Sequence, residues 1–517
     1  MTQSAKPARK PGQPAQPARV PTGRERLLLG QARRKQLKRQ AHAVWNPKDR
    51  QQDPLDLLAA SNRGRIPSLV ALKEERMTAS PFAYLRGSVP VMAYDLSLAP
   101  NTGLLSQLCG DAHVRNLGAF AGPDGRLVFD INDFDETVLG PFEWDVKRMA
   151  TSLILAGREA GAGSLRCREA AATFLTQYRD LMHLFSKMPV LEVARYQVHR
   201  LAQVGPVAAI LNAARRSTPL HSLAALTEPV PTDESNQTEK TETAGKPAKH
   251  RPKHPQSRRF KTAEPVLWRL TEHEAQPVIA SLVPYAESLL PERRRFLAQY
   301  RVLDVAFKVV GTGSVGLRDY CIYLEGNGSK DPLFLQIKEE TLSAYAPFVG
   351  EKALRDYHQG RRTVEGERAM QIQSDPFLGW TTIVDPRTGK PRDFLVRQLN
   401  DHKASLDLSS LKSAGLMEYA KVAGEILARG HARSGDFAML AGYLGTSDRF
   451  CDAITRFAET YADQTEKDWE QFVKSLKASG KLPKKGGQGK KTVIKTALTR
   501  KVSVTLPSDE TERNSSR

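Results

Sequence analysis

The sequence predicts an α+β fold with two lobes, and three observations lead to this prediction. Apolar runs of strand length, separated by turn residues, occur in two regions that are far apart in the chain. Around them, apolar residues recur at a spacing of three and four over stretches long enough for helices. The excess of positive charge is confined to the two ends, so we expect the neutral residues 51–473 to form the folded body.

The net charge of +20, from 77 Lys+Arg and 57 Asp+Glu, is unevenly distributed. Residues 1–50 hold 13 Lys/Arg against 2 Asp/Glu, and residues 474–517 hold 12 against 3, which leaves 52 of each sign for the body. Both ends are poor in aromatic residues, which is typical of disordered tails. We therefore expect at most a weak contact with polyanions through these tails, and no nucleic-acid-binding surface on the body.

The cysteines and the hydropathy pattern indicate the compartment. Cys109, Cys167, Cys321 and Cys451 are far apart and lack CxxC spacing, which excludes a disulfide framework and a cysteine metal site. The chain has no run of 18 apolar residues and hence no transmembrane segment, and its N-terminus lacks the apolar core of a signal peptide. We expect a soluble cytoplasmic protein.

The chain has one internal break, at residues 225–262, where an acidic run passes into a basic run and predicts a disordered insertion. The predicted segments are a disordered basic tail (1–50), a part of the helical lobe with two polar loops (51–224), the insertion (225–262), a helical connection (263–299), a strand-rich lobe (300–405), the completion of the helical lobe (406–473) and a second disordered basic tail (474–517).

The first body segment predicts a hairpin followed by a helix. LSQLCGDAHVRNLGAF, the turn Pro123-Asp124-Gly125 and RLVFDIND indicate strand, polar loop, turn and strand. PFEWDVKRMATSLILAGREAG then predicts a helix with Pro141 near its first turn. Its core-facing stripe consists of Val146, Met149, Ala150, Leu153 and Ile154.

The second body segment predicts an antiparallel meander. VAFKVV, the glycine run GTGSVG, DYCIYLEG, the turn Asn327-Gly328 and PLFLQIKEE have strand lengths and turn signals. KALRDYHQGRRTVEGERAMQIQ is then helical in pattern, DFLVRQL is another strand, and LMEYAKVAGEILARGHARSG is an amphipathic helix.

The densest polar cluster of the sequence lies in GDAHVRN (110–116) and FDINDFDE (129–136). So many carboxylates at strand ends repel one another unless a cation neutralises them, and Mg²⁺ prefers carboxylate and amide oxygens. The alternative is that these residues form turns and cap the next helix, since Asp and Asn are common there. Because a short hairpin joins the two loops, we expect them to converge on one metal site.

The spacing within this cluster indicates a reaction. Asp111 and Asn116 have the D-x-x-x-x-N spacing of a kinase catalytic loop, in which the Asp takes the hydroxyl proton and the Asn holds a metal ion. Asp133, 22 residues after Asp111, is expected to be the second metal ligand. We add His113 as a catalytic candidate and Asp130 as a further metal candidate.

A glycine run provides the second signal. Gly311, Gly313 and Gly316 form G-x-G-x-x-G, and LRDYCIYLEG after them is strand-like, whereas a dinucleotide fingerprint must open a helix. The run therefore favours a glycine-rich hairpin over the phosphates of ATP, and its alternative is a flexible turn.

A lysine follows the glycine run at the distance of one hairpin. Lys338 lies 22 residues beyond Gly316, as the phosphate-binding strand lysine of a kinase would. We expect Glu365 to be its helix partner, with Glu351 and Glu367 as alternatives.

The order of these motifs is reversed relative to a kinase, because Asp111 comes about 200 residues before the glycines. Lys73 in LVALKEE does not solve this, since only 38 residues separate it from Asp111. We therefore expect a circular permutation, in which the helix ending in LARGHARSG leads in space to the catalytic loop.

Several motifs also resemble known families. SPFAYLRGS, GDAHVRNLG, FDINDFDETVLGPFEWDVKR, VVGTGSVGLR, LQIKEE and LARGHARSGD resemble the bacterial domain-of-unknown-function 2252 family over about residues 60–470, which implies no settled activity. GDAHVRN is also similar to the Gly-Asp-Leu-His-x-x-Asn loop of aminoglycoside phosphotransferase-like kinases, and NDFDETVLGPFEWD to their metal segment and later structural Asp, here Asp145. Protein kinases have His-Arg before the catalytic Asp and Lys after it, where this chain has Cys109-Gly110 and His113, so small-molecule kinases are the better match.

These observations together predict a circularly permuted, kinase-like fold that binds ATP and Mg²⁺ and transfers phosphate to an unidentified hydroxyl acceptor, preferably a small molecule. A nucleotide-binding pseudokinase or scaffold, and a nucleotidyltransferase, are alternatives with the same site. A metal-dependent hydrolase on Asp111, His113, Asp130 and Asp133 is a third, and it would reduce GTGSVG to a turn.

Overall fold

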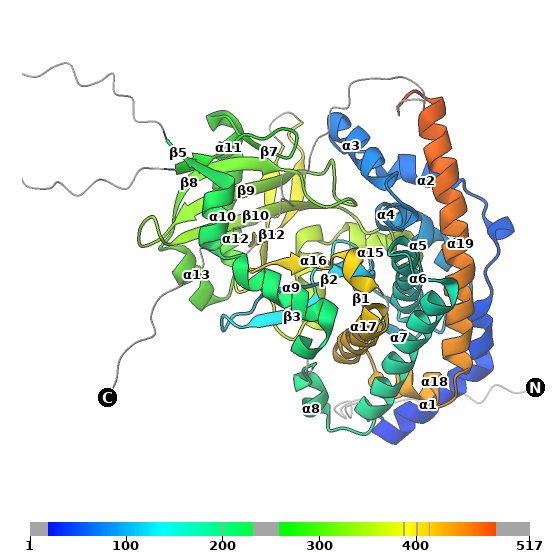
Figure 1. The fold of residues 1–517 in the computed structure, drawn as a ribbon. Helices are drawn as coiled ribbons and strands as arrows, with labels where there is room; N and C mark the ends of the chain where they lie inside the picture. Colours follow the sequence, from blue (N-terminus) through cyan, green and yellow to red (C-terminus); the bar gives the residue numbers. More distant parts are fainter. Residues whose placement is uncertain are drawn as a thin grey trace, which may run out of the picture. The chain divides into compact units, whose positions relative to one another are not determined.

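A computed structural model describes residues 19–198, 201–230, 258–385, 388–399, 402–412 and 414–481. The chain divides into two units, Met1–Val473 and Lys474–Arg517. Among the described residues, the first unit contains every strand and all helices except the end of the last one. It is mixed α+β, as the sequence predicts (Figure 1).

The helices of the first unit that flank the polar loops pack around one large hydrophobic core, to which α6, α7 and α17 contribute Leu153, Phe174 and Ile426. The α-helices of this part are α1 (Gly23–Gln36), α2 (Pro54–Ser61), α3 (Pro67–Met77), α4 (Pro81–Gly87), α5 (Val89–Ser97), α6 (Glu143–Glu159), α7 (Ser164–Phe185), α8 (Val190–Arg195), α9 (Gly205–Arg216), α17 (Ala414–Ser434), α18 (Phe437–Leu444) and α19 (Arg449–Ala478). Short 3₁₀ helices are η1 (Arg39–Ala43), η2 (Pro47–Asp49), η3 (Val114–Asn116), η4 (Leu201–Gln203) and η6 (Leu408–Leu411).

Short antiparallel pairs frame the two polar loops. β1 (Leu105–Leu108) pairs with β4 (Val138–Pro141), and β2 (Leu117–Ala121) pairs with β3 (Leu127–Ile131). The edge strand β13 (Ala404–Ser405) adds to β2. Residues 109–116 connect β1 to β2, and residues 132–137 connect β3 to β4, so the strand pairing brings the two loops side by side.

The largest sheet has six antiparallel strands in the order β11-β12-β10-β9-β8-β7. Its strands are β7 (Leu267–Arg269), β8 (Arg301–Lys308), β9 (Asp319–Glu325), β10 (Pro332–Glu340), β11 (Gly379–Val384) and β12 (Pro391–Gln398). The helices near it are α10 (Pro219–Leu226), α11 (Glu272–Ala280), α12 (Leu282–Ser288), α13 (Pro291–Leu297), α14 (Ala346–Val349), α15 (Glu351–Arg355) and α16 (Gln359–Met370).

The pleat of β10 divides its side chains between the two faces of this sheet. Leu335 and Ile337 pack in the core that includes α11 and α12. Gln336 and Lys338 lie on the opposite face, and both line a pocket that the polar loops share. Strand β10 therefore places the buried Lys338 next to the two polar loops.

The first basic tail begins to fold earlier than the sequence predicts, so the assignment of residues 1–50 to a disordered tail is wrong for their later part. Helix α1 starts at a capping box between Thr22 and Glu25. Arg34 Nε donates to the Tyr443 carbonyl at 2.9 Å, and an Arg39 Nη donates to the Leu444 carbonyl at 2.7 Å. These arginines stabilise the end of α18, where carbonyls lack helical partners.

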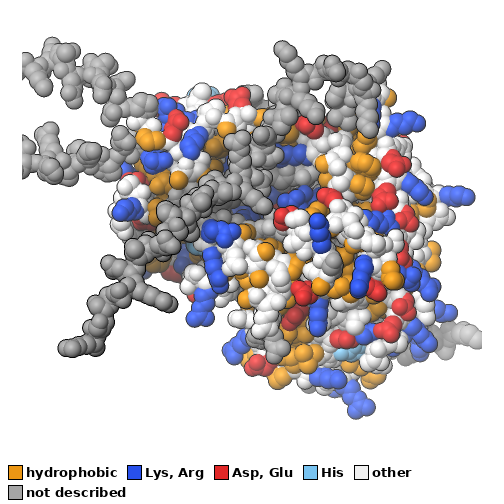
Figure 2. Space-filling model, viewed as in Figure 1, with side chains coloured by type: hydrophobic (Ala, Val, Ile, Leu, Met, Phe, Trp, Pro, Cys, Tyr) orange, Lys and Arg blue, Asp and Glu red, His pale blue; other side chains and the backbone are white. Residues whose placement is uncertain are grey.

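The predicted insertion, residues 225–262, is structured at both of its ends. Its two ends form strands β5 (Thr227–Pro229) and β6 (Arg258–Phe260), which pair antiparallel. Residues 231–257 and most of the predicted C-terminal tail lie outside the described residues. On the face of the molecule in Figure 2, Lys/Arg and Asp/Glu side chains are interspersed.

Two further expectations concern the whole chain. Within the described ranges, no helix combines the length and the apolar character that a membrane crossing requires. Cys109, Cys167, Cys321 and Cys451 are all buried thiols.

Candidate functional site

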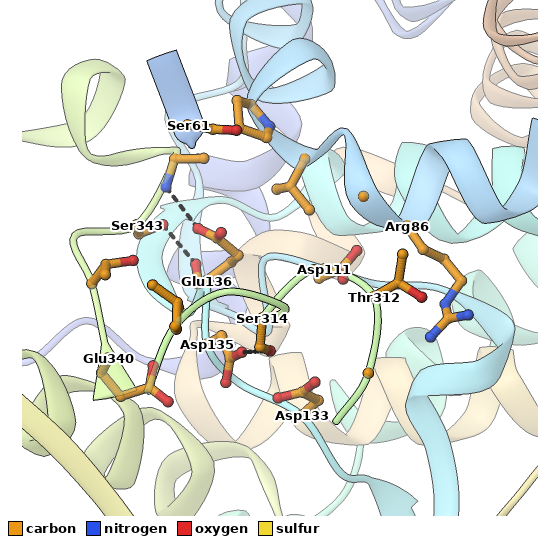
Figure 3. A pocket seen from close by; sticks show the side chains of 18 of the residues that line it. Ser61, Arg86, Asp111, Asp133, Asp135, Glu136, Thr312, Ser314, Glu340 and Ser343 are labelled. Carbon is orange, nitrogen blue, oxygen red and sulfur yellow. Dashed lines mark hydrogen bonds between the residues drawn. The ribbon is translucent and has the colours of Figure 1, made fainter. Parts of the chain in front are cut away.

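A cavity of about 870 Å³ lies between the polar loops, the glycine run, β10 and the helices α2 to α5 (Figure 3). The predicted site residues that line it are Asp111, His113, Asn116, Asp133, Gly311, Gly313 and Lys338. Figure 3 shows Asp111, Asp133 and Asp135 between Arg86 and Thr312 on one side and Glu340 and Ser343 on the other.

The loop that carries Asp111 is held by hydrogen bonds to Asp145, in the first turn of α6. The Asp145 carboxylate accepts the backbone N–H of Cys109 at 2.7 Å and that of Gly110 at 3.1 Å. Gly110 has φ +80°, and a Cβ there would lie 2.2 Å from the Glu136 carbonyl oxygen, so only glycine fits. Asp145 therefore ties the Asp111 loop to the start of α6.

Asp111 is paired with a buried arginine. Arg148 of α6 has a fully buried side chain, and its Nε donates to Asp111 Oδ1 at 2.8 Å. Burial alone would raise the pKa of Asp111, but Arg148 and His113 outweigh it and lower the pKa to about 2. Asp111 is therefore a carboxylate at every physiological pH.

His113 lies beside Asp111, with 3.4 Å between its Nε2 and Asp111 Oδ2. Burial lowers the pKa of His113, although Asp111 opposes this effect. The imidazole is consequently neutral near pH 7, and it can donate or accept one proton at each ring nitrogen according to its tautomer.

Asn116 joins the two loops. Its Nδ2 donates to the backbone carbonyl of Asp111 at 3.1 Å and to that of Asp133 at 2.9 Å. The amide thus sets the distance between the proposed catalytic loop and the proposed metal loop.

Lys338 reaches the loop of residues 132–137 from the sheet. Its Nζ lies 3.2 Å from Asp133 Oδ1 and 2.6 Å from Asp135 Oδ1. The lysine side chain is 2% exposed, whereas Asp133 keeps 40% of its side chain exposed. Although burial opposes the charge, the two carboxylates raise the pKa of Lys338, so it stays protonated.

The carboxylates on the acidic side of the pocket raise one another's pKa values. Burial and the neighbouring Asp133 raise the pKa of Asp135, and burial and Asp135 raise the pKa of Glu340 well above its usual value. Glu340 Oε1 is buried without a hydrogen-bond partner. Lys338 contacts Asp133 and Asp135, and Arg362 lies 4.0 Å from Glu340, so the exposed oxygens of Asp133 are the ones most open to a further cation.

The donor set suits Mg²⁺ held together with a nucleotide. Among the described residues, no three His, Cys, Asp or Glu side chains are arranged to hold a metal ion on their own. Mg²⁺ in nucleotide sites needs only one or two carboxylates, because phosphates and water supply the other ligands. Asp133, Asp135 and Asn116 fit that requirement.

The glycine run forms the turn between β8 and β9 and contacts the loop of residues 132–137. Ser314 Oγ donates to Asp135 Oδ2 at 3.0 Å. From the other side, an Arg65 Nη donates to the Val315 carbonyl at 2.6 Å, and Arg76 donates to the Gly311 carbonyl. The glycine run is therefore held between the loop of residues 132–137 and the region of α3.

Three predicted site residues lie elsewhere. Glu365 is bonded to Arg361 Nε at 2.8 Å and to Tyr357 Oη at 2.5 Å on the surface, so it does not pair with Lys338. Asp130 is buried and forms an ion pair with Arg429, which leaves it outside the pocket. Gly316 adopts a left-handed backbone conformation at the end of the glycine run, next to Arg65, and does not line the pocket.

The alternative partners of Lys338 are also placed differently. Glu351 lines the pocket but forms an ion pair with Arg355. Glu367 is buried, and burial raises its pKa to about 7. Asp133 and Asp135, not a helix glutamate, are the partners of Lys338.

Sequence reasoning missed several charged residues that line this pocket or support it. They are Arg65, Lys73, Arg86, Arg148, Glu340, Arg397 and Lys403. Arg86 stands in SPFAYLRGS and Arg148 in FEWDVKR, motifs that carry the family resemblance, so both could have been singled out. Lys73 was considered only as a substitute for Lys338.

Comparison with known proteins gives one match. Searches of the curated proteins and of the solved structures returned no match. A family model described as "Uncharacterized protein conserved in bacteria (DUF2252)" matches residues 65–475, which include both polar loops, the glycine run and Lys338. The chain therefore belongs to the DUF2252 family of bacterial proteins.

Proposed function

We propose that this protein is an ATP- and Mg²⁺-dependent phosphotransferase with a circularly permuted, two-lobed, kinase-like fold, acting on a hydroxyl acceptor. The observation that carries the proposal is the contact of Lys338 with Asp133 and Asp135, more than 200 positions away in sequence. A phosphate-binding lysine and a metal-binding carboxylate must reach the same nucleotide in any kinase.

The order of elements in the sheet supports this assignment. The glycine run joins β8 to β9, Lys338 lies on the next strand β10, and helix α16 follows before β11. Kinases arrange their glycine loop, strand lysine and following helix in this order.

The contact between α17 and β1 supports the permutation. Gly435, just after α17, lies so close to β1 that a Cβ on it would be 2.3 Å from Ser106 Oγ. Strand β1 leads directly to the Asp111 loop. A chain that passed from α17 into β1 would have the usual kinase order, from sheet to helix to catalytic loop.

The residues of the pocket would have different roles in phosphoryl transfer. Lys338 and the backbone amides of the glycine run would bind the phosphates of ATP. Asp133, Asp135 and Asn116 would hold Mg²⁺, which neutralises the charge of the phosphates when bound. Asp111 would accept the hydrogen bond of the acceptor hydroxyl and orient its oxygen.

The low pKa of Asp111 determines its part in the reaction. A carboxylate with a pKa of about 2 is a weak base, so it positions the hydroxyl rather than removing its proton early. A loose phosphoryl-transfer transition state needs little deprotonation of the acceptor, and catalysis depends chiefly on positioning.

Binding of nucleotide without turnover is the second candidate, and the Arg148–Asp111 pair favours it. An arginine that occupies Asp111 Oδ1 leaves fewer carboxylate lone pairs for a substrate hydroxyl. The two candidates differ in whether the γ-phosphate leaves ATP.

The experiment is a label-transfer assay. The full chain is incubated with Mg²⁺, a bacterial small-molecule extract and ATP labelled at either the γ- or the α-phosphate. We expect γ-label to move to a small molecule, and Asp111→Asn to reduce the transfer by about 10²-fold, because the acceptor oxygen is no longer oriented. The control Asp124→Asn, in the exposed turn between β2 and β3, should transfer label at the wild-type rate. Transfer of α-label would indicate nucleotidyl transfer, and ATP binding without transfer would indicate the second candidate.

A further inference from the structure

The pocket contains positive charge that the proposed nucleotide site does not use. Arg86 lies at the end of α4 within SPFAYLRGS, and Arg115 lies within GDAHVRN, four positions after Asp111. Both line the pocket. Figure 3 shows Arg86 beside Thr312, on the side of Asp111 and Asp133 that is opposite to Glu340.

Neither arginine has a direct ion-pair partner in the described part of the chain. Among the described residues, no carboxylate lies within ion-pair distance of Arg86 or Arg115, whereas Arg148 and Lys338 each pair with an aspartate. Arg86 Nε is buried and has no hydrogen-bond partner. Buried charged donors in folded proteins are normally bonded, so an orphaned guanidinium nitrogen in a pocket indicates a ligand.

The surroundings of Arg86 favour an anion. Burial lowers the pKa of Arg86 to about 10 and the positive charge of Arg115 adds to this effect, while Asp111, Asp133 and Glu159 oppose it. An anionic group that accepts hydrogen bonds here would relieve the repulsion and satisfy the orphaned Arg86 Nε.

The place of this subsite relative to Asp111 indicates which substrate it serves. The charge of Arg86 interacts with those of Asp111 and Asp133, but Lys338 lies among Asp133, Asp135 and Glu340. Lys338, on the side of Glu340, is available for the phosphates of ATP. Arg86 lies beyond Asp111, next to Thr312 of the glycine run, and is available for a second anionic group.

We propose that Arg86 and Arg115 bind an anionic group, a phosphate or a carboxylate, of the acceptor, an inference that rests on the phosphotransferase function proposed above. The acceptor is then a small hydroxyl compound that already carries such a group. The fork geometry of arginine suits the oxygens of both anions, and the cavity of about 870 Å³ has room for a second small molecule beside a nucleotide.

The test is a calorimetric titration of inorganic phosphate, and separately of succinate, into the full chain. Each titration is run without nucleotide and again with Mg²⁺ and the non-hydrolysable imido analogue of ATP at saturation. We expect at least one probe to bind the nucleotide-loaded wild type, and Arg86→Gln and Arg115→Gln each to weaken it about tenfold. Stronger binding of phosphate identifies a phosphorylated acceptor, and stronger binding of succinate a carboxylate acceptor.

Two variants protect this test from a folding defect. Arg115 is exposed, so Arg115→Gln should fold even if Arg86→Gln does not. The matched control is Arg126→Gln, because Arg126 is 88% exposed in the turn between β2 and β3, and it should bind the probe as the wild type does.

Three results would overturn the inference: no binding of either probe, equal binding by the wild type and both pocket variants, or displacement of the probe by the ATP analogue. The last would make the two arginines part of the nucleotide site. A wild-type chain that fails to bind the analogue would instead refute the phosphotransferase proposal. In that case the titration without nucleotide still tests the anion subsite through the same variants.

Discussion

Arg148 holds Asp111 in place, and its replacement should be costly. The arginine side chain is fully buried and donates to Asp111 and, at 2.9 Å, to the Leu85 carbonyl. Arg148→Met leaves the buried carboxylate without its cation, so we expect the free energy of unfolding in urea to fall by about 3–5 kcal/mol.

The matched control for this measurement is Arg168→Met. Arg168 is 54% exposed and lies 3.9 Å from Glu459, a surface contact whose loss should cost less than about 1 kcal/mol. A loss below about 1 kcal/mol for Arg148→Met as well would show that Asp111 does not depend on this pair.

Lys73 should make the stability of the protein depend on pH. The lysine is 2% exposed and donates to Asn62 Oδ1 at 2.9 Å, and burial together with Arg65 lowers its pKa to about 7. Between this value and the ordinary lysine pKa of about 10.4, the unfolded chain binds a proton that the folded chain lacks, so stability rises with pH.

The comparison for Lys73 is with Lys73→Met between pH 7 and pH 9.5. The free energy of unfolding of the wild type, relative to that of the variant, should increase by up to about 1.4 kcal/mol per pH unit. This is the slope expected when the unfolded chain binds one proton more than the folded chain. Lys421→Met, at an exposed position of α17, should follow the wild type. A difference between wild type and Lys73→Met that stays constant with pH would contradict the low pKa.

At the scale of elements, the glycine run has two kinds of glycine. Gly316 has φ +93°, and a Cβ on it would lie 3.1 Å from Arg65 Cβ, whereas a Cβ on Gly313 would lie 3.6 Å from its nearest neighbour, the Arg86 carbonyl oxygen. We expect Gly316→Ala to lower the free energy of unfolding by about 1–2 kcal/mol, because left-handed backbone is strained for alanine.

Gly313→Ala is the matched control in the same turn. Its added methyl group meets ordinary van der Waals distances, so the free energy of unfolding should change by less than about 0.5 kcal/mol. Equal effects of the two substitutions in thermal or urea unfolding would mean that Gly316 is not constrained by its backbone.

For the whole molecule, the two basic ends should differ in their importance. Arg50 bonds to Asp95 at 2.6 Å and to Asp468 at 2.8 Å, and all three side chains are nearly buried. Deletion of residues 1–50 leaves both carboxylates unpaired, so we expect the body to lose its cooperative thermal unfolding transition.

Deletion of residues 482–517 is the comparison. These residues belong to the separate unit Lys474–Arg517, so the melting temperature should not change, while retention on a polyanion column should fall. An unchanged melting temperature after deletion of residues 1–50 would contradict the role of Arg50. Unchanged retention after the second deletion would exclude polyanion contact by the C-terminal tail.

The contact between the Asp111 loop and the Asp133 loop could be predicted from the sequence, because a short hairpin joins the two loops. Asp111, Asn116 and Asp133 follow short strands joined by a hairpin, and Lys338 lies one hairpin beyond the glycine run. Glu365 could not be predicted in the same way, since the face that α16 turns inward depends on how the helix packs against β12.

The positions of Arg86 and Arg148 at the pocket could not be predicted from motif spacing, for a similar reason. Each comes from a helix whose approach to the pocket is set by packing in the large core, to which Leu85 and Met149 belong. Packing of distant elements leaves no periodic signal in the sequence next to such residues.

The most direct test of the account is the affinity of the full chain for ATP, measured by calorimetry with and without Mg²⁺. We expect Mg²⁺-dependent binding by the wild type and by Lys421→Met, and a loss of at least about tenfold in Asp133→Asn and in Lys338→Met, since both lose a charged contact with the nucleotide or its metal. ATP binding of wild-type affinity in Asp133→Asn, or no ATP binding by the wild type, would contradict the proposed function.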